Sequence, residues 1–319
     1  MIFQAHPNSF ILSIRIMPNQ ASVPARTRLI SAGVANMLLA TFAFSVMNVF
    51  VKQLNHIPAI EIVFFRCLIS AAICFVGIAH ARVDWKGNNN ALLIARGTFG
   101  TLALFAFFVT IQNIPLATAV TIAYLAPIFT TLIGVFVLGE HVRKLQWLFY
   151  AIAFAGVLVI KGFDAAVPTP FLLTGIASAL CAAVAYNLVR RLKEQEHPLV
   201  VVLHFQLVGV VAGLVFTLLN WRTPSGAWQW FCLLMCGLLT QVGQTCLTKA
   251  LQSERLAYVS ILNYTGLIYA LAFGVIIFGE VYTTQTITGI ALVVFGVVLS
   301  VIFGKRRPLE VLEESELVE

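Results

Sequence analysis

Several polar side chains lie inside long apolar stretches of this sequence, where each needs a partner or a cavity. Arg66 is about nine residues, or ~13 Å at 1.5 Å per residue, into one such stretch. A guanidinium at that depth would attract a carboxylate or another anion. The alternative is a structural arginine that binds backbone carbonyls or is neutralised by Glu61, five residues earlier on the same helix. The residues alone leave both interpretations open.

A second group of polar residues could share a site with Arg66. Gln241 and Gln244 are three residues apart, a spacing that places both amides on one helix face. They could bind a substrate or hold neighbouring helices together. His204 could take up a coupling proton or stay neutral inside a helix bundle. The other candidates for lining a cavity, with simple packing as their alternative, are Gln206, Tyr124, Tyr264 and Asn263.

The composition indicates a membrane protein. Hydrophobic residues make up 60% of the 319 positions, charged residues only 10%, and the mean hydropathy is +0.94, so one soluble core could not bury the apolar side chains. The excess of 20 Lys and Arg over 13 Asp and Glu suits membrane topology, and we expect no nucleic-acid partner. The partners we expect are the lipid bilayer and a small-molecule substrate.

The sequence contains no recognisable catalytic or metal site. The six cysteines all fall inside apolar stretches, and neither their spacing nor a companion His or Asp suits zinc. The HExxH and GxSxG motifs are absent, as are paired aspartates within the apolar stretches. We therefore expect no catalytic residue, no metal and no cofactor.

Ten hydrophobic stretches have the length of a membrane-spanning helix. Short connections with turn residues separate them, so consecutive helices should be antiparallel neighbours. Residues 1–32 and 304–319 are expected to be terminal tails. The predicted spans are 33–51, 57–79, 91–111, 115–138, 145–161, 171–189, 200–219, 227–249, 256–278 and 285–303.

The basic residues predict how the spans are oriented. With ten spans, 16 of the 20 Lys and Arg residues, Arg96 among them, fall on the side that holds both termini. The opposite side holds only Lys52, Lys161 and Arg222. Because basic residues concentrate in cytoplasmic loops, both termini are predicted to be cytoplasmic.

The chain repeats itself at a shift of 140 residues. VFVLGEHVRK at 135–144 corresponds to VIIFGEVYTT at 275–284, and 12 of 46 positions are identical between 112 and 157, against about five expected by chance. The shift equals five helices, an odd number, so the second unit should enter the membrane from the opposite face. We predict an all-α membrane protein of two inverted five-helix repeats, residues 33–161 and 171–303. In this alignment His204 and Gln206 match Phe64 and Arg66.

Each repeat has a Gly-Glu pair after an apolar run. Glycine can end a helix in the left-handed conformation, and a carboxylate before the next helix favours its positive N-terminal end. We interpret Glu140 and Glu280 as such structural caps, in preference to a role in transport chemistry.

Three further features concern motion and packing. Pro127, in the middle of the predicted 115–138 helix, should kink it and is a candidate hinge. GVVAG at 209–213 is a GxxxG pattern that favours close packing, within the chain or in a homodimer. Asn48 and Asn187, on the first helix of each repeat, are weaker candidates because they are one position out of register.

The chain resembles the EamA-type transporters of the drug/metabolite transporter superfamily. The resemblance covers about residues 33–303 and includes VFFRCLIS at 63–70 and AYLAPIFTTLIGVFVLGE at 123–140. It implies an inverted-repeat secondary transporter in the cytoplasmic (inner) membrane of a prokaryote, with a central cavity and alternating access. The second repeat departs from the pattern, because Leu267 stands at the Pro127 position and Gln206 at the Arg66 position.

These observations favour transport of a small organic metabolite, such as an amino acid or another anionic or zwitterionic compound. An intramembrane enzyme lacks the motifs it would need. The alternative is a channel or membrane scaffold without alternating access. Saturable, trans-stimulated flux would separate the two classes.

Overall fold

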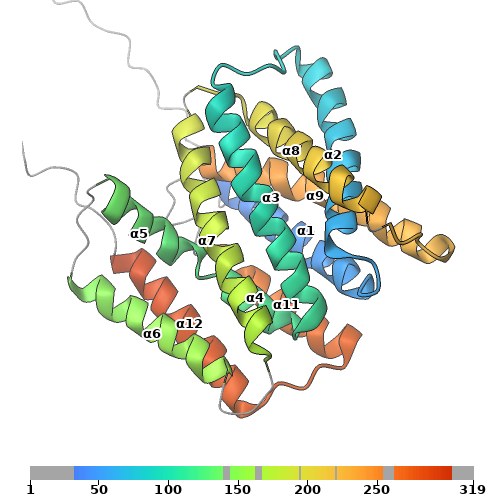
Figure 1. Cartoon of the computed structure of the whole chain (residues 1–319). Coiled ribbons are helices and arrows are strands. Elements are labelled where there is room, and N and C mark those ends of the chain that lie inside the picture. The colour runs from blue at the N-terminus through green and yellow to red at the C-terminus, as the bar shows by residue number, and fades with distance from the viewer. Residues whose placement is uncertain are drawn as a thin grey trace, which may run out of the picture. The chain divides into compact units, whose positions relative to one another are not determined.

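The part of the chain that the structure describes is built from α-helices. The computed structural model describes residues 32–138, 144–161, 167–193, 195–219, 221–253 and 262–303. The helices in these ranges (Figure 1) are α1 (Ala32–Gln53), α2 (Ala59–Ala81), α3 (Asn90–Asn113), α4 (Leu116–Ala123), α5 (Ala126–Leu138), α6 (Lys144–Lys161), α7 (Thr169–Leu192), α8 (Pro198–Leu219), α9 (Gly226–Ser253), α11 (Thr265–Phe278) and α12 (Thr284–Phe303).

The helices agree with a protein that crosses the membrane many times. Within the described ranges, nine helical segments are long and apolar enough to span a bilayer, and one of them joins α4 to α5 over Leu116–Phe136. The apolar helix α11 is shorter, at 14 residues. Residues 254–261, where the ninth predicted span begins, lie outside the described residues. The prediction of an all-α, multi-span membrane protein is therefore confirmed.

Local sequence signals set the helix ends. Pro58, Pro115 and Pro168 directly precede α2, α4 and α7, where the missing N–H of proline costs nothing. The side chain of Asn89 accepts a hydrogen bond from the backbone N–H of Leu92 and caps α3. Gly279 ends α11 in the left-handed conformation, with φ of 62°. These stops keep the connections short.

Helices from the first half of the chain (α1 to α6) pack on helices from the second half (α7 to α12). The main pairs are α1 with α9, α3 with α7, α2 with α8 and α6 with α12. Figure 1 shows α6 beside α12 and α3 beside α7. Adding 140 to the residue numbers of α1, α2, α3 and α6 gives approximately those of α7, α8, α9 and α12. The pairs α1–α9 and α3–α7 are thus equivalent when the halves are exchanged.

Two interfaces depend on small residues. Gly156 of α6 and Gly289 of α12 face each other: a Cβ at Gly156 would lie 2.7 Å from the carbonyl oxygen of Gly289. In α8, a Cβ at Gly213 would lie 2.8 Å from the Cβ of Phe64, and one at Gly209 would overlap the Sγ of Cys67. The GVVAG stretch therefore packs on α2 of the same chain. A homodimer stays a prediction that this contact does not support.

The fourth predicted span is interrupted. α4 ends at Ala123 and α5 begins at Ala126, with Tyr124 and Leu125 in a turn between them. A proline ring clashes with the carbonyl four residues earlier, which for Pro127 is the carbonyl of Ala123. A kink within one continuous 115–138 helix was expected. The structure instead has two helices with a break just before Pro127. The use of this break as a hinge stays a prediction.

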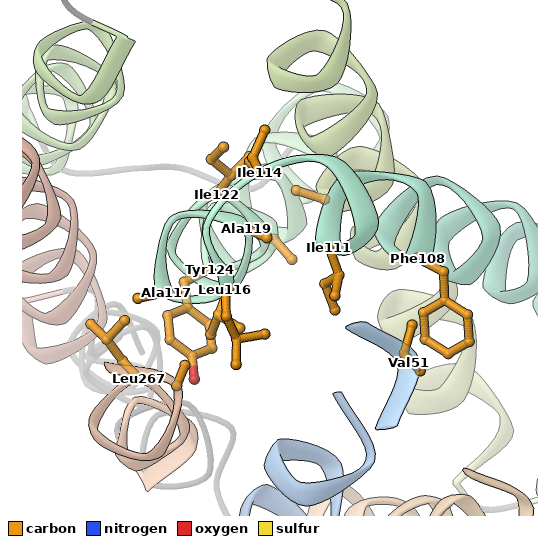
Figure 2. Packing of buried hydrophobic residues seen from close by; sticks show 14 of the residues in the cluster. Val51, Phe108, Ile111, Ile114, Leu116, Ala117, Ala119, Ile122, Tyr124 and Leu267 are labelled. Carbon is orange, nitrogen blue, oxygen red and sulfur yellow. The ribbon is translucent and has the colours of Figure 1, made fainter. Parts of the chain in front are cut away.

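A buried apolar core surrounds the break. It contains side chains from α1, α3, α4 and α11, seen in Figure 2, where Tyr124 points toward the helix that carries Leu267. Phe108 and Val51, both fully buried, belong to the same cluster. The break is thus held among close-packed helices.

Candidate functional site

A cavity of about 190 Å³ lies among helices of both halves. Residues of α1, α2, α3, α4, α7, α8, α9 and α11 line it, whereas the described parts of α5, α6 and α12 do not. Arg66 and Arg96 are the only charged side chains among the described residues that line the cavity. The site is therefore lined mainly by apolar helices and is positively charged.

Arg66 is fully buried and has no polar partner among the described residues. Its exposed fraction is 0%, and no described residue accepts a hydrogen bond from its Nε, Nη1 or Nη2. The guanidinium carbon lies 5.8 Å from the ring centre of Phe108 and 5.5 Å from that of Phe205. These cation–π contacts hold the guanidinium without neutralising it.

Glu61 does not serve as the counterion of Arg66. Its Oε2 instead accepts a hydrogen bond, 3.0 Å long, from the backbone N–H of Arg222, just beyond the end of α8. The ion pair recorded within the described ranges is Lys52 with Glu280. Among the described residues, neither Glu61 nor a backbone carbonyl accepts a hydrogen bond from the Arg66 guanidinium, so the structural interpretation of Arg66 gains no support.

Arg96 is a second cavity arginine, which its count among the cytoplasmic-side basic residues did not predict. The prediction counted Arg96 with the basic residues of the loops. In the structure it lies in the second turn of α3, and its side chain is only 4% exposed. Its guanidinium carbon is 4.1 Å from the ring centre of Phe205, and Nη2 donates a 3.5 Å hydrogen bond to Oε1 of Gln244. Nε and Nη1 have no acceptor among the described residues. Its position within the predicted 91–111 span, five residues after the first residue of that span, was the signal that could have revealed it.

The two repeat-matched tyrosines meet beside the cavity. The Tyr124 hydroxyl donates a 2.8 Å hydrogen bond to the backbone carbonyl of Asn263, and both residues line the cavity. The ring of Tyr264 packs edge-on against that of Tyr124, with centroids 4.9 Å apart. Tyr264 itself does not contribute to the described lining.

The two glutamines of α9 have separate positions. Oε1 of Gln241 accepts a 2.7 Å hydrogen bond from Ser70 of α2, and its Nε2 donates to Thr245. Gln241 thus joins α9 to α2 and does not appear in the cavity lining. Gln244 lines the cavity and binds Arg96. Gln241 therefore has the position expected for helix packing, and Gln244 has the position expected for substrate contact.

The candidates in α8 flank Phe205, which lines the cavity. Nδ1 of His204 lies 3.0 Å from the carbonyl oxygen of Val200 in its own helix, and His204 is not among the described lining residues. Gln206 is fully buried, with no described partner for either amide atom, and it too is outside the lining. Phe205 was missed because nothing in the sequence distinguishes it from the other 24 phenylalanines.

A polar stripe on α1 also escaped full notice. Thr41, Ser45 and Asn48 line the cavity, and their spacing of four and three residues places them on one helix face. That spacing was readable from the sequence. Asn187, the other weaker candidate, instead donates a 3.3 Å hydrogen bond to the backbone carbonyl of Thr130 and joins α7 to α5.

Glu280 caps a helix, but not the one expected. Both of its carboxylate oxygens lie 3.0 Å from the backbone N–H of Leu116, the first residue of α4, and Oε1 lies 2.7 Å from Nζ of Lys52. The carboxylate therefore stabilises the N-terminus of α4 instead of α12, because the left-handed turn at Gly279 redirects the chain after α11. Its repeat mate Glu140 lies outside the described residues.

Lys52 and Tyr282 complete this contact. Nζ of Lys52 donates to the carbonyl of Ile114, 2.8 Å away, and the Tyr282 hydroxyl donates to Oε2 of Glu280, 2.5 Å away. Burial and the neighbouring Glu280 carboxylate raise the pKa of Tyr282, so the hydroxyl keeps the proton that it donates. The contact connects the end of α1, the start of α4 and the turn after α11.

Comparisons with known proteins agree with this architecture. The EamA-like transporter family matches residues 31–162 and again residues 169–302. The pseudopaline exporter CntI of Pseudomonas aeruginosa is 31% identical over 268 residues, covering 83% of this chain and 94% of that protein. Human solute carrier family 35 member G1 is 27% identical over 285 residues, covering 82% of this chain and 76% of that protein.

A solved crystal structure shares the fold. It matches with a TM-score of 0.61 at 19% identity, covering 86% of this chain and 98% of that one. The two family matches together span most of the chain, and the relatives named above are transporters or solute carriers. The chain therefore belongs to the EamA-like transporter family of the drug/metabolite transporter superfamily, as a multi-pass membrane transporter of a small molecule.

Proposed function

We propose that the protein is a secondary transporter that carries a small anionic or zwitterionic metabolite, such as an amino acid, by alternating access. The observation that carries this proposal is the pair of buried arginines in the cavity. Neither Arg66 nor Arg96 has a described carboxylate partner. An unpaired guanidinium is costly in a low-dielectric interior, and an anionic ligand would offset that cost.

Alternating access requires two bodies that can move against each other. The packing of α1 on α9 has its equivalent in the packing of α7 on α3, because α1 corresponds to α7 and α3 to α9. This symmetry supports a pair of inverted five-helix repeats. Both copies also have a turn at the matching tyrosine, since Tyr264 is a turn residue immediately before α11, as Tyr124 is between α4 and α5. We propose that the helices bend at these two turns during the change of access.

The ion pair of Lys52 and Glu280 fits a gate at one end of the cavity. It connects α1 to the start of α4 and to the turn after α11. With both termini cytoplasmic, the end of α1 faces outward. Separation of Lys52 from Glu280 would then open the outer side. We place the protein in the cytoplasmic membrane of a prokaryote, as the bacterial exporter it resembles supports.

The test combines ligand binding with flux. Metabolites are screened by thermal shift on purified wild-type protein, on Arg66→Gln and on Arg222→Gln, an exposed arginine outside the cavity. A compound that stabilises wild type and Arg222→Gln, but not Arg66→Gln, is then followed in liposomes. Saturable, trans-stimulated flux of that compound supports the proposal. Linear flux without trans-stimulation would indicate the alternative of a channel, and binding without any flux would indicate a scaffold.

Coupling to protons is a separate part of the proposal. His204 is half-buried in α8, beside Phe205 of the cavity. If it carries the coupling proton, His204→Gln should abolish acceleration of flux by a pH gradient while substrate binding persists. An unchanged response to the gradient would assign His204 a packing role.

A further inference from the structure

Arg66 and Arg96 share one aromatic side chain. Their guanidinium carbons lie 5.5 Å and 4.1 Å from the ring centre of Phe205. Two like charges that both contact one ring repel each other, and the low dielectric of the interior strengthens the repulsion. Aromatic contacts and the single amide of Gln244 offset only part of that cost. The two guanidinium charges can therefore be compensated by more than one negative charge on a ligand.

The other lining residues add no charge. Among the described residues that line the cavity there is no Asp, Glu, Lys or His. A bound monoanion would leave one guanidinium uncompensated. A zwitterion would compensate even less, because its ammonium group would find no carboxylate in that lining and would face two arginines.

The cavity is small, and the Arg96 guanidinium packs closely against Gly100. Its volume of about 190 Å³ is below the ~300–1,000 Å³ of pockets for drug-sized ligands. A Cβ at Gly100 would lie 2.9 Å from the ring of Phe205 and would overlap Nη1 of Arg96. Glycine at this position allows the guanidinium and the ring to occupy one end of the cavity together.

We infer that the transported molecule is a short-chain compound with two anionic groups, such as an α,ω-dicarboxylate, with one carboxylate at Arg66 and the other at Arg96. This inference rests on the proposed transport function and narrows its substrate class from anionic or zwitterionic to dianionic. Each guanidinium can form two parallel hydrogen bonds to a carboxylate, which supplies geometry as well as charge. Apolar lining residues, such as Phe44 and Leu104, remain for the connecting carbon chain.

The test uses chain-matched probes at constant ionic strength. Dissociation constants of purified full-length protein are measured for succinate, butyrate and 4-aminobutyrate, and for linear dicarboxylates of two to six carbons. We expect a dicarboxylate to bind about 10- to 100-fold more tightly than the matched monoanion and zwitterion. Binding of none of the dicarboxylates, or equal or tighter binding of butyrate or 4-aminobutyrate, would overturn the assignment.

Variants then connect the preference to Arg96. Arg96→Gln should lower dicarboxylate affinity about 10- to 100-fold and reduce the preference over butyrate, whereas Arg222→Gln should retain it. Gly100→Ala keeps both arginines but displaces Arg96, so it should weaken the same preference and provides a second variant if Arg96→Gln does not fold. An unchanged preference in folded Arg96→Gln would contradict the role of Arg96.

Flux separates this inference from the transport proposal. Saturable, trans-stimulated flux of a monoanion or zwitterion, with no binding of any dicarboxylate, would overturn the dianion assignment and leave the transport proposal standing. Tight dicarboxylate binding with linear flux would support the assignment and contradict alternating access.

Discussion

The rings of Tyr124 and Tyr264 meet edge to face, with centroids 4.9 Å apart and an angle of 80° between their planes. The two residues correspond at the 140-residue shift; Tyr124 lies in the turn between α4 and α5, and Tyr264 lies in the turn before α11. The contact therefore joins equivalent points of the two halves, next to the cavity. Only one hydroxyl is engaged: Tyr124 donates to the carbonyl of Asn263, and the Tyr264 hydroxyl has no partner among the described residues.

This asymmetry predicts that the two tyrosines respond differently to loss of the hydroxyl. Tyr124→Phe should lower the free energy of unfolding by about 0.5–1.5 kcal/mol and slow flux, because it leaves a backbone carbonyl at the break unpaired. Tyr264→Phe keeps its ring contact and loses no described hydrogen bond, so it is the matched control. Unfolding in mixed micelles and liposome flux measure both. Equal effects of the two substitutions would contradict the assigned bond.

The contact between Lys52 and Glu280 predicts energetic coupling. Lys52→Met or Glu280→Gln alone should destabilise the protein by about 1–3 kcal/mol, because each leaves a partly buried charge without its partner. The double variant should cost less than the sum, with a coupling energy of about 0.5–3 kcal/mol in a double-mutant cycle. Additive effects would show that the ion pair does not hold this end of the bundle together.

The GVVAG stretch predicts a packing defect without a change in oligomeric state. Gly209→Ala forces a Cβ onto the Sγ of Cys67 and should lower the melting temperature. Gly77→Ala, in α2, places its Cβ an ordinary 3.8 Å from Leu199 and should be neutral or stabilising. Size-exclusion chromatography with light scattering should show the same mass for both. A loss of dimer specific to Gly209→Ala would indicate that the stretch serves an interface between chains.

The two glutamines of α9 predict opposite phenotypes. Gln241→Ala removes the hydrogen bond to Ser70 and should cost about 0.5–2 kcal/mol of stability with little change in substrate affinity. Gln244→Ala removes the partner of Arg96 in the cavity and should change substrate affinity with little loss of stability. Melting temperature and half-saturation for flux measure the two effects. The reverse pattern would contradict the placement of the cavity.

Much of the architecture was predictable from the sequence because membrane spans follow simple rules. Apolar runs of the right length marked the helices, and the family resemblance is confirmed by the two matched segments. Arg66, Tyr124, Gln244 and Asn263 were each expected near a substrate, and the structure places all four around one cavity. Their role in binding stays a prediction.

The remaining features depend on tertiary contacts that no local pattern records. Phe205 matters only because two arginines from other helices approach it. Arg96 was assigned to the cytoplasmic side because it lies only a few residues after the start of its helix. In the structure its side chain lines the cavity. Glu280 was expected to cap the next helix in sequence, whereas the nearest helix N-terminus in space is that of α4. In each case position along the chain was a poor guide to position in the bundle.

Access to the cavity from each side of the membrane tests the central claim most directly. A single cysteine at Ala182, a cavity-lining residue of α7, is introduced into a chain whose six native cysteines are replaced by alanine. Its labelling by a membrane-impermeant maleimide is measured from each side of oriented vesicles, with and without Glu280→Gln. Alternating access predicts labelling from both sides of the membrane. Glu280→Gln should raise the labelling rate from the side on which Glu280 lies and lower the labelling rate from the opposite side. Rates that rise together on both sides, or labelling that occurs from one side only, would contradict the account.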